Sequence, residues 1–354
     1  MSSIGRAAVI LLTSLLLCPL NAAAWDRGEI QKFATLPIGS PNPEGITVDS
    51  HGNVYVSTFA VPPRTSEGQL FVFGRNGHLR GQVSIQSSSS QLLGLDFLSD
   101  GYLLVIDFGN KQVLKVNPWS GASSVFATLP IAPDDLRSGA GLNALTFDTG
   151  GNVYISDSFQ GIIWRTGPGG GVAEKWVKDT LLTTTGTPPF GANGLAFNKD
   201  GSALFVANTG DDRIIKIKIP VNLTTPAEVF VNSINGADGL IIDKDDNLWV
   251  AANQSDEIVV LDKTGKVIAK LGDFDGLDRH GAPIGLLFPA SLVRHDGWIY
   301  VTNLALDLRL FGLPQAVDSQ WAAQAKTPTI SRIRARIPRI SGLCKGHGKG
   351  ANCD

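Results

Sequence analysis

Short apolar runs alternate with polar turns along most of the chain, and one phrase of this pattern occurs six times. Each copy begins with one residue at a fixed position, which we call the register residue. It is usually followed by Gly, and then come an apolar run, a polar turn and a second apolar run. The clearest copy is GADGLIIDKDDNLWVAAN at 236–253. The register residues, spaced by 49, 50, 50, 45 and 52 positions, are Glu44, Leu93, Asn143, Asn193, Asp238 and Ala290. A period of this length indicates a repeat architecture.

Each repeat predicts one four-stranded antiparallel sheet. In the fifth repeat the strands read GLIID, NLWVAA, EIVVLD and VIAKLG. Turns such as KDDN and TGGN are rich in residues that tolerate a left-handed backbone. Six such sheets predict an all-β fold, a six-bladed β-propeller that occupies residues 25–314.

The N-terminal strand is expected to close the ring. The segment FATLPI at 33–38 recurs at 126–131, just before the third inner strand, so the outermost strand of one repeat precedes the next inner strand. The strand at about 29–36 has no repeat before it, and the last repeat, from Ala290 to about 313, has no outer strand of its own. Pairing the first strand with the last sheet leaves only short, protected edges.

Residues 1–24 have the pattern of a signal peptide. Arg6 precedes the apolar run AAVILLTSLLL, and Ala22 to Ala24 fit a cleavage site, which places the mature N-terminus at Trp25. The alternative is an uncleaved membrane anchor. We expect a secreted or periplasmic monomer with no transmembrane span once this segment is removed. The formal net charge of -2 gives no indication of a nucleic-acid partner.

Residues 315–354 read as a basic C-terminal extension outside the core. Cys344 and Cys353 are expected to pair with each other, because disulfides persist in exported proteins. The basic residues either contact an anionic surface or belong to a solvated tail.

Oxygen-bearing side chains occupy four of the six register positions. Inner strands of a propeller run roughly along its axis, so Glu44, Asn143, Asn193 and Asp238 are expected to converge at one mouth of the tunnel. Such a set suits Ca²⁺, and Mg²⁺ or Mn²⁺ less well. Burying two carboxylates without a cation is also costly. The alternative is that Asn-Gly and Asp-Gly are ordinary turn dipeptides.

Four insertions interrupt the repeats, and three of them immediately precede an inner strand. They are residues 58–69, 129–141, 179–192 and 273–289. All can gather at the face where the register residues lie, and loops grouped at one end of a rigid scaffold usually carry the site.

The strand openings EGI, NAL, NGL and DGL resemble those of the superfamily of regucalcin-type gluconolactonases, diisopropylfluorophosphatase and paraoxonases. The resemblance covers about residues 30–313. It implies a six-bladed propeller with one catalytic Ca²⁺ held by Glu44, Asn143, Asn193 and Asp238. Gly45 and Ala144 stand where paraoxonases carry Asp residues for a second calcium, so we expect one metal.

The resemblance also implies a calcium-dependent hydrolase that acts on a small lactone or related ester. Asp238 is the first candidate for general base as well as ligand, and His280 is the second. Leu93 and Ala290 leave two blades without a polar register group, which does not favour a sugar lactone. The alternatives are a non-enzymatic propeller that binds a protein or glycan, and a lyase like the streptogramin-inactivating propellers, which needs another base.

Overall fold

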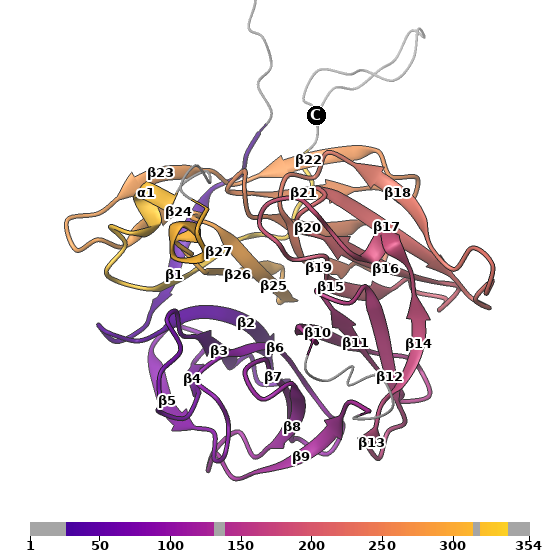
Figure 1. Cartoon of the computed structure of the whole chain (residues 1–354). Helices are drawn as coiled ribbons and strands as arrows, with labels where there is room; N and C mark the ends of the chain where they lie inside the picture. Colours follow the sequence, from indigo (N-terminus) through magenta and orange to yellow (C-terminus); the bar gives the residue numbers. More distant parts are fainter. Residues whose placement is uncertain (1–25, 131–138, 314–318, 339–354) are drawn as a thin grey trace, which may run out of the picture. The chain divides into compact units, whose positions relative to one another are not determined.

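Six sheets surround a central axis in the computed structural model, which describes residues 26–130, 139–313 and 319–338 (Figure 1). The inner strands β2, β6, β10, β15, β19 and β25 face the axis, and each begins close to a register residue. The predicted six-bladed propeller is therefore confirmed. The predicted leader at 1–24 and the pair Cys344 and Cys353 lie outside the described residues.

Each blade has four antiparallel strands. In blade 1 these are β2 (Asn42–Val48), β3 (Val54–Phe59), β4 (Gln69–Phe73) and β5 (Leu79–Ser84). In blade 2 they are β6 (Leu92–Phe97), β7 (Leu103–Asp107), β8 (Gln112–Val116) and β9 (Ser123–Thr128). In blade 3 they are β10 (Leu142–Phe147), β11 (Val153–Asp157), β12 (Ile162–Thr166) and β14 (Glu174–Lys178). A short strand, β13 (Gly171–Val172), pairs in parallel with β9 at the edge of blade 2.

Blades 4 to 6 complete the ring. In blade 4 the strands are β15 (Ala192–Phe197), β16 (Ala203–Asn208), β17 (Arg213–Lys218) and β18 (Glu228–Asn232). In blade 5 they are β19 (Ala237–Ile242), β20 (Leu248–Ala252), β21 (Glu257–Leu261) and β22 (Val267–Leu271). In blade 6 they are β25 (Pro289–His295), β26 (Trp298–Asn303), β27 (Thr329–Arg334) and β1 (Ile30–Thr35).

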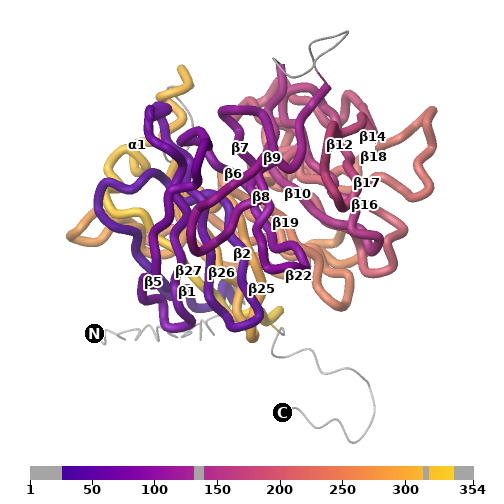
Figure 2. The backbone as a smooth tube through the Cα atoms, turned by 90° about the horizontal axis from the view of Figure 1, so that it is seen from below, coloured from indigo at the N-terminus to yellow at the C-terminus, as the bar shows by residue number. Residues whose placement is uncertain are grey.

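Blade 6 confirms closure by the N-terminal strand and corrects the boundary predicted at residue 314. Strand β1 is the outermost strand, but its partner is β27, which belongs to the predicted extension. Figure 2 shows β1, β27, β26 and β25 next to one another. The segment expected to end the last repeat instead forms a 3-10 helix, η2 (Leu308–Phe311). The propeller therefore continues to Arg334.

The predicted extension contributes buried side chains, so it is not a wholly solvated tail. Ile330 and Ile333 of β27 are 0% and 2% exposed. The guanidinium groups of Arg332 and Arg334 lie over the ring of Trp298, with Cζ 4.3 and 3.8 Å from its centre. Cation–π contact and burial of the side-chain stems explain how a strand this basic fits a blade.

The hydrophobic core lies between neighbouring blades. Between blades 1 and 2, for example, Tyr55, Leu70 and Val72 pack against Leu95 and Leu103. Sheets that pack face to face around a ring bury both faces, and this explains why the second strands β3, β7, β11, β16 and β20 are buried along their length. The ring supplies a rigid frame for the residues at its axis.

Few residues of the described ranges are helical. Besides η2 there are η1 (Thr180–Leu182) and α1 (Ser319–Ala322), and the insertion before blade 6 forms a hairpin of β23 (Phe274–Leu277) and β24 (Pro283–Gly285). No helix among the described residues has the length and apolar character needed to cross a membrane.

Candidate functional site

A bulge interrupts every inner strand at its register residue. The pairing of each inner strand with the next strand shifts between Pro43/Ile46, Leu92/Leu95, Leu142/Leu145, Ala192/Leu195, Ala237/Leu240 and Pro289/Leu292. Bulges redirect side chains and are often found beside active sites. All six register residues therefore occupy the same irregular position in their blades.

The glycine after the register residue allows neighbouring inner strands to approach closely. A Cβ atom on Gly45 would lie 2.3 Å from the Leu93 carbonyl oxygen, and one on Gly194 would lie 2.5 Å from that of Asp238. Neither contact is possible for a larger residue without a backbone shift. The Asn-Gly and Asp-Gly dipeptides, which are also typical of turns, thus allow the inner strands to pack closely at the axis.

The structure brings the four predicted oxygen donors together in one cavity of about 40 Å³. Thr209 and Asn253, at the ends of the second strands of blades 4 and 5, join them. Three of the four insertions also contribute lining residues: Phe59, then Pro188 and Phe190, then Phe288. The expectation that these insertions gather at the register residues is met for these three segments.

Hydrogen bonds orient the two asparagine amides. The Ser158 hydroxyl donates its one proton to the Ala192 carbonyl oxygen at 2.6 Å, so it can only accept from Asn143 Nδ2, at 3.1 Å. Asn193 Nδ2 donates in the same way to Thr209 Oγ1 at 3.0 Å. With both nitrogen atoms held by hydroxyls of the second strands, the amide oxygens of Asn143 and Asn193 are left for the cavity.

The two carboxylates are buried and only partly hydrogen-bonded. Glu44 and Asp238 are 4% and 5% exposed. Asn253 Nδ2 donates to Asp238 Oδ2 at 2.8 Å, and Gln254 Nε2 donates to Asn253 Oδ1 at 3.1 Å. Glu44 Oε2 and Asp238 Oδ1 are buried and have no hydrogen-bond partner among the described residues. Such atoms cost free energy unless another group satisfies them.

Burial dominates the electrostatics of the two carboxylates. Burial, and then the neighbouring charge of Asp238, raise the pKa of Glu44 well above its usual range. Burial also raises the pKa of Asp238 to about 7, although the neighbouring amide groups of Asn253 and Asn193 act in the opposite direction. A divalent cation between the two would favour both ionised forms.

The donor chemistry fits Ca²⁺ well. Two carboxylates and two amide oxygens form a hard, all-oxygen set, and water molecules complete such sites in proteins. Within the described ranges, no three His, Cys, Asp or Glu side chains come together as a metal cluster. The four oxygen-bearing residues Glu44, Asn143, Asn193 and Asp238 line one cavity, and we call them the ligand set.

His280 is not brought to this cavity, which corrects the prediction that it could reach the site. It is exposed in the turn between β23 and β24 and is absent from the residues that line the cavity. Asp278 Oδ1 accepts from the His280 backbone N–H at 2.8 Å, and the Thr327 hydroxyl donates to the His280 carbonyl oxygen at 2.8 Å. These contacts hold the turn against the segment before β27.

Ser158, Thr209 and Asn253 were missed in the sequence, although a signal for them exists. They occupy equivalent positions just after the second strands of blades 3, 4 and 5. The corresponding residues of blades 1, 2 and 6 are Phe59, Phe108 and Leu304. The position just after the second strand is therefore a second register. It is polar in blades 3, 4 and 5 and apolar in blades 1, 2 and 6.

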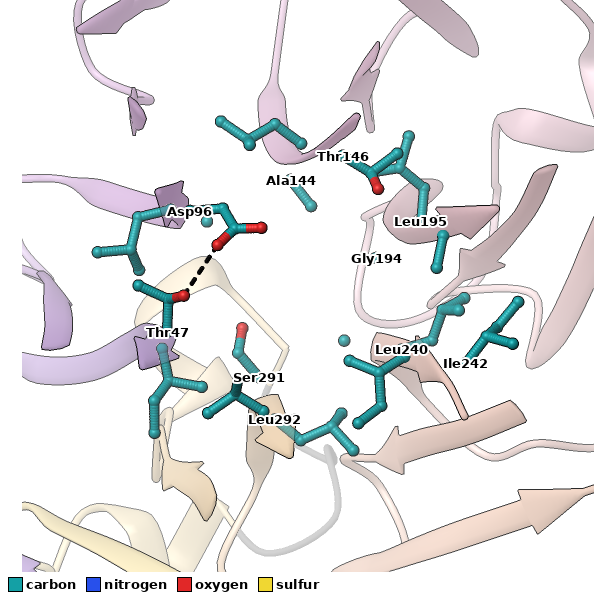
Figure 3. Close-up of a pocket in the computed structure, with 18 of the residues that line it drawn as sticks. Thr47, Asp96, Ala144, Thr146, Gly194, Leu195, Leu240, Ile242, Ser291 and Leu292 are labelled. Atoms are coloured by element: carbon teal, nitrogen blue, oxygen red, sulfur yellow. Dashed lines mark hydrogen bonds between the residues drawn. The ribbon is translucent and has the colours of Figure 1, made fainter. Parts of the chain in front are cut away.

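A second cavity of about 340 Å³ lies farther along the inner strands (Figure 3). Its lining includes the polar residues Thr47, Asp96, Thr146 and Ser291, and the Thr47 hydroxyl donates to Asp96 Oδ1 at 2.9 Å. Burial raises the pKa of Asp96 although hydrogen bonds from Phe97 and Thr47 lower it. Asp96 does not line the cavity of the ligand set, so it offers a matched control for Asp238.

Calcium is expected to raise the melting temperature more at about pH 8 than at about pH 5. Glu44 and Asp238 have raised pKa values in the folded, metal-free protein but ionise near pH 4 when unfolded. Between about pH 4 and pH 7 the folded state therefore binds more protons, and these two groups lower stability as pH rises. Calcium requires the ionised forms, so its stabilisation grows over the same range.

Thermal unfolding of dialysed protein with and without calcium across this pH range measures the effect. Only the calcium-induced difference is compared, because other carboxylates also titrate. The double variant Glu44→Gln, Asp238→Asn should lose the pH-dependent difference. An equal shift at both pH values in the natural chain would contradict the assignment of these two ligands.

Comparisons with known proteins agree with this architecture. Lactonase drp35 of Staphylococcus epidermidis is 26% identical over 241 residues, which cover 53% of this chain and 71% of that protein. Regucalcin from Agrobacterium tumefaciens, described as a calcium-binding protein, has a similar structure with a TM-score of 0.57 and 17% identity, covering 88% and 96% of the two chains.

A lyase shares the fold as well. A catalytically inactive histidine-to-alanine variant of virginiamycin B lyase from Staphylococcus aureus, solved with quinupristin, gives a TM-score of 0.56 at 13% identity. The match covers 86% of this chain and 99% of the lyase. At 13% and 17% sequence identity, the similarity to the lyase and to regucalcin shows a shared fold alone.

The family model described as the SMP-30/gluconolactonase/LRE-like region matches residues 88–272, just over half of the chain. This match contains three of the four residues of the ligand set and the bulges that position them. The chain therefore belongs to the SMP-30/gluconolactonase/LRE-like family.

Proposed function

We propose that the mature, exported chain is a calcium-dependent hydrolase that opens a lactone or related ester. The proposal depends on the cavity, where buried Glu44 Oε2 and Asp238 Oδ1 have no hydrogen-bond partner in the described part of the chain and lie beside two oriented amide groups. The relatedness to lactonase drp35 supports a lactone substrate, and the description of regucalcin as calcium-binding supports the metal.

Calcium bound by the ligand set would polarise the substrate carbonyl and stabilise negative charge that develops on its oxygen. Asp238 is the best-placed base among the cavity residues. Asn253 holds its Oδ2 atom, which leaves Oδ1 as the atom that accepts a proton from water. The water oxygen then bonds to the carbonyl carbon, the ring C–O bond breaks, and the released alkoxide takes a proton to give a hydroxy acid.

A lyase is less well supported by the cavity. The virginiamycin B lyase that shares the fold is catalytically inactive in its histidine-to-alanine variant, whereas the described residues that line this cavity include no histidine. A non-enzymatic binding propeller remains the alternative class. Hydrolysis, measured together with calcium binding, separates these possibilities.

Hydrolysis of simple lactones is expected to disappear in metal-free protein and to return when calcium is added. Calcium at about 100 times its Kd should also stabilise the fold by about 2.7 kcal/mol, seen as a higher melting temperature. Magnesium at equal concentration is the control cation, since its stricter octahedral geometry suits this set less well. A calcium-dependent thermal shift without hydrolysis of any lactone or ester would favour a binding propeller instead.

A further inference from the structure

The cavity of the ligand set has an apolar part that exceeds its polar part. The polar residues are Glu44, Asn143, Asn193, Thr209, Asp238 and Asn253. The apolar residues are Phe59, Leu93, Pro188, Phe190, Phe288, Leu304 and Leu306. Most of the apolar group comes from blades 1, 2 and 6, where the position after the second strand is Phe59, Phe108 or Leu304 rather than a polar residue. One side of the cavity is thus free to contact a hydrocarbon group.

Four phenylalanine rings form a continuous row beside this cavity, which we call the aromatic row. The ring centres of Phe59 and Phe108 are 5.6 Å apart, those of Phe108 and Phe159 are 5.9 Å apart, and those of Phe159 and Phe190 are 5.6 Å apart. Phe59 and Phe190 both line the cavity. Phe59 is 4% exposed and Phe159 is 46% exposed, so the row is buried at Phe59 and reaches solvent at Phe159.

The amide nitrogen atoms of the cavity already have hydrogen-bond partners. The amide nitrogens of Asn143 and Asn193 bond to Ser158 and Thr209. Asn253 uses its nitrogen for Asp238 and accepts from Gln254. The free oxygen atoms are those suited to a cation. A substrate with many hydroxyl groups would find few partners here, and buried hydroxyls without partners are costly.

Resting on the proposed function, we propose that the substrate is a lactone that carries an aliphatic or aromatic substituent. The aromatic row forms one wall for this substituent, and Leu304 and Leu306 of blade 6 belong to the apolar lining that completes its site. Aromatic side chains supply large apolar contact areas. The ligand set then acts on the carbonyl group, and the apolar residues determine which lactones are selected.

Three lactones with the same six-membered ring test this inference in the calcium-loaded full chain. They are δ-valerolactone without a substituent, δ-decalactone with a pentyl group, and glucono-δ-lactone with several hydroxyls. We expect kcat/KM for δ-decalactone to exceed that for δ-valerolactone by at least about tenfold, since one buried methylene contributes about fourfold. Glucono-δ-lactone, corrected for spontaneous hydrolysis, should be the poorest of the three.

Substitution of the wall should remove this preference. In Phe190→Ala the ratio of kcat/KM for δ-decalactone to that for δ-valerolactone should fall about tenfold. Leu306→Ala, from a different segment of the lining, should lower the same ratio if Phe190→Ala is unstable. Phe230→Ala is the matched control, because Phe230 is a half-buried ring on β18 that packs on Phe205 outside the cavity. It should leave the ratio unchanged.

The outcomes separate this inference from the function on which it rests. Preference for δ-decalactone that both wall variants reduce supports it. Calcium-dependent hydrolysis with equal or higher kcat/KM for glucono-δ-lactone overturns the apolar substrate class and leaves the hydrolase intact. Absence of hydrolysis with all three lactones overturns both.

Discussion

Asp238→Asn is expected to lower kcat for lactone hydrolysis by about 10²- to 10⁴-fold, the range typical for loss of a general base. The substitution keeps the shape of the side chain and one carbonyl oxygen, but it removes the charge and the basic Oδ1 atom. Asn253 still has an oxygen to which it can donate, so the local hydrogen bonding is largely conserved. Calcium binding should weaken but persist.

Two variants make this result specific. Asp96→Asn replaces another tunnel carboxylate with a raised pKa, which does not line the cavity, and it should retain kcat. Glu44→Gln removes a charged ligand without an assigned base role, so excess calcium should restore much of its activity. Steady-state kinetics over a calcium titration compares all three. Undiminished kcat in Asp238→Asn at saturating calcium would show that another group is the base.

The repeat made the ring and the four residues of the ligand set predictable from the sequence. Inner strands in a closed ring are equivalent, so one register defines one height, and Glu44, Asn143, Asn193 and Asp238 could be chosen without any contact information. The bulges at these residues could not be predicted from the sequence. An apolar run preceded by a polar residue is the same pattern whether the strand is bulged or regular. The glycines at 45, 194 and 239 were the available hint.

The prediction was wrong where the chain leaves the repeat. TISRIR at 329–334 is a strand whose Thr329, Ile330, Ser331 and Ile333 are buried, yet its two arginines resembled a basic tail. The stacking of those arginines on Trp298 is a tertiary contact, which the local sequence pattern does not predict. The prediction for His280 was wrong for a similar reason, because its loop folds as a hairpin against residues near Thr327 rather than over the cavity.

A chain that ends at Pro328 is expected to lose the cooperative fold, whereas one that ends at Pro338 should melt within a few degrees of the full chain. The shorter chain lacks β27, which lies between β26 and β1 and pairs with both. Without it the N-terminal strand has no partner, and the ring opens at blade 6. Burial of Ile330 and Ile333 alone stabilises the fold by about 1.5–3 kcal/mol each.

The loss should extend to the ligand set. Asn303 Nδ2 of β26 donates to Thr329 Oγ1 at 2.9 Å and to Ser331 Oγ at 3.0 Å, and both partners disappear with β27. The adjacent Thr302 hydroxyl donates to the Glu44 carbonyl oxygen at 2.6 Å, so displacement of β26 would disturb the strand that carries Glu44. Several kcal/mol is a large part of the stability of an ordinary domain. Thermal unfolding and calcium binding of the two truncated chains test this, and equal melting temperatures would show that β27 is dispensable for the ring.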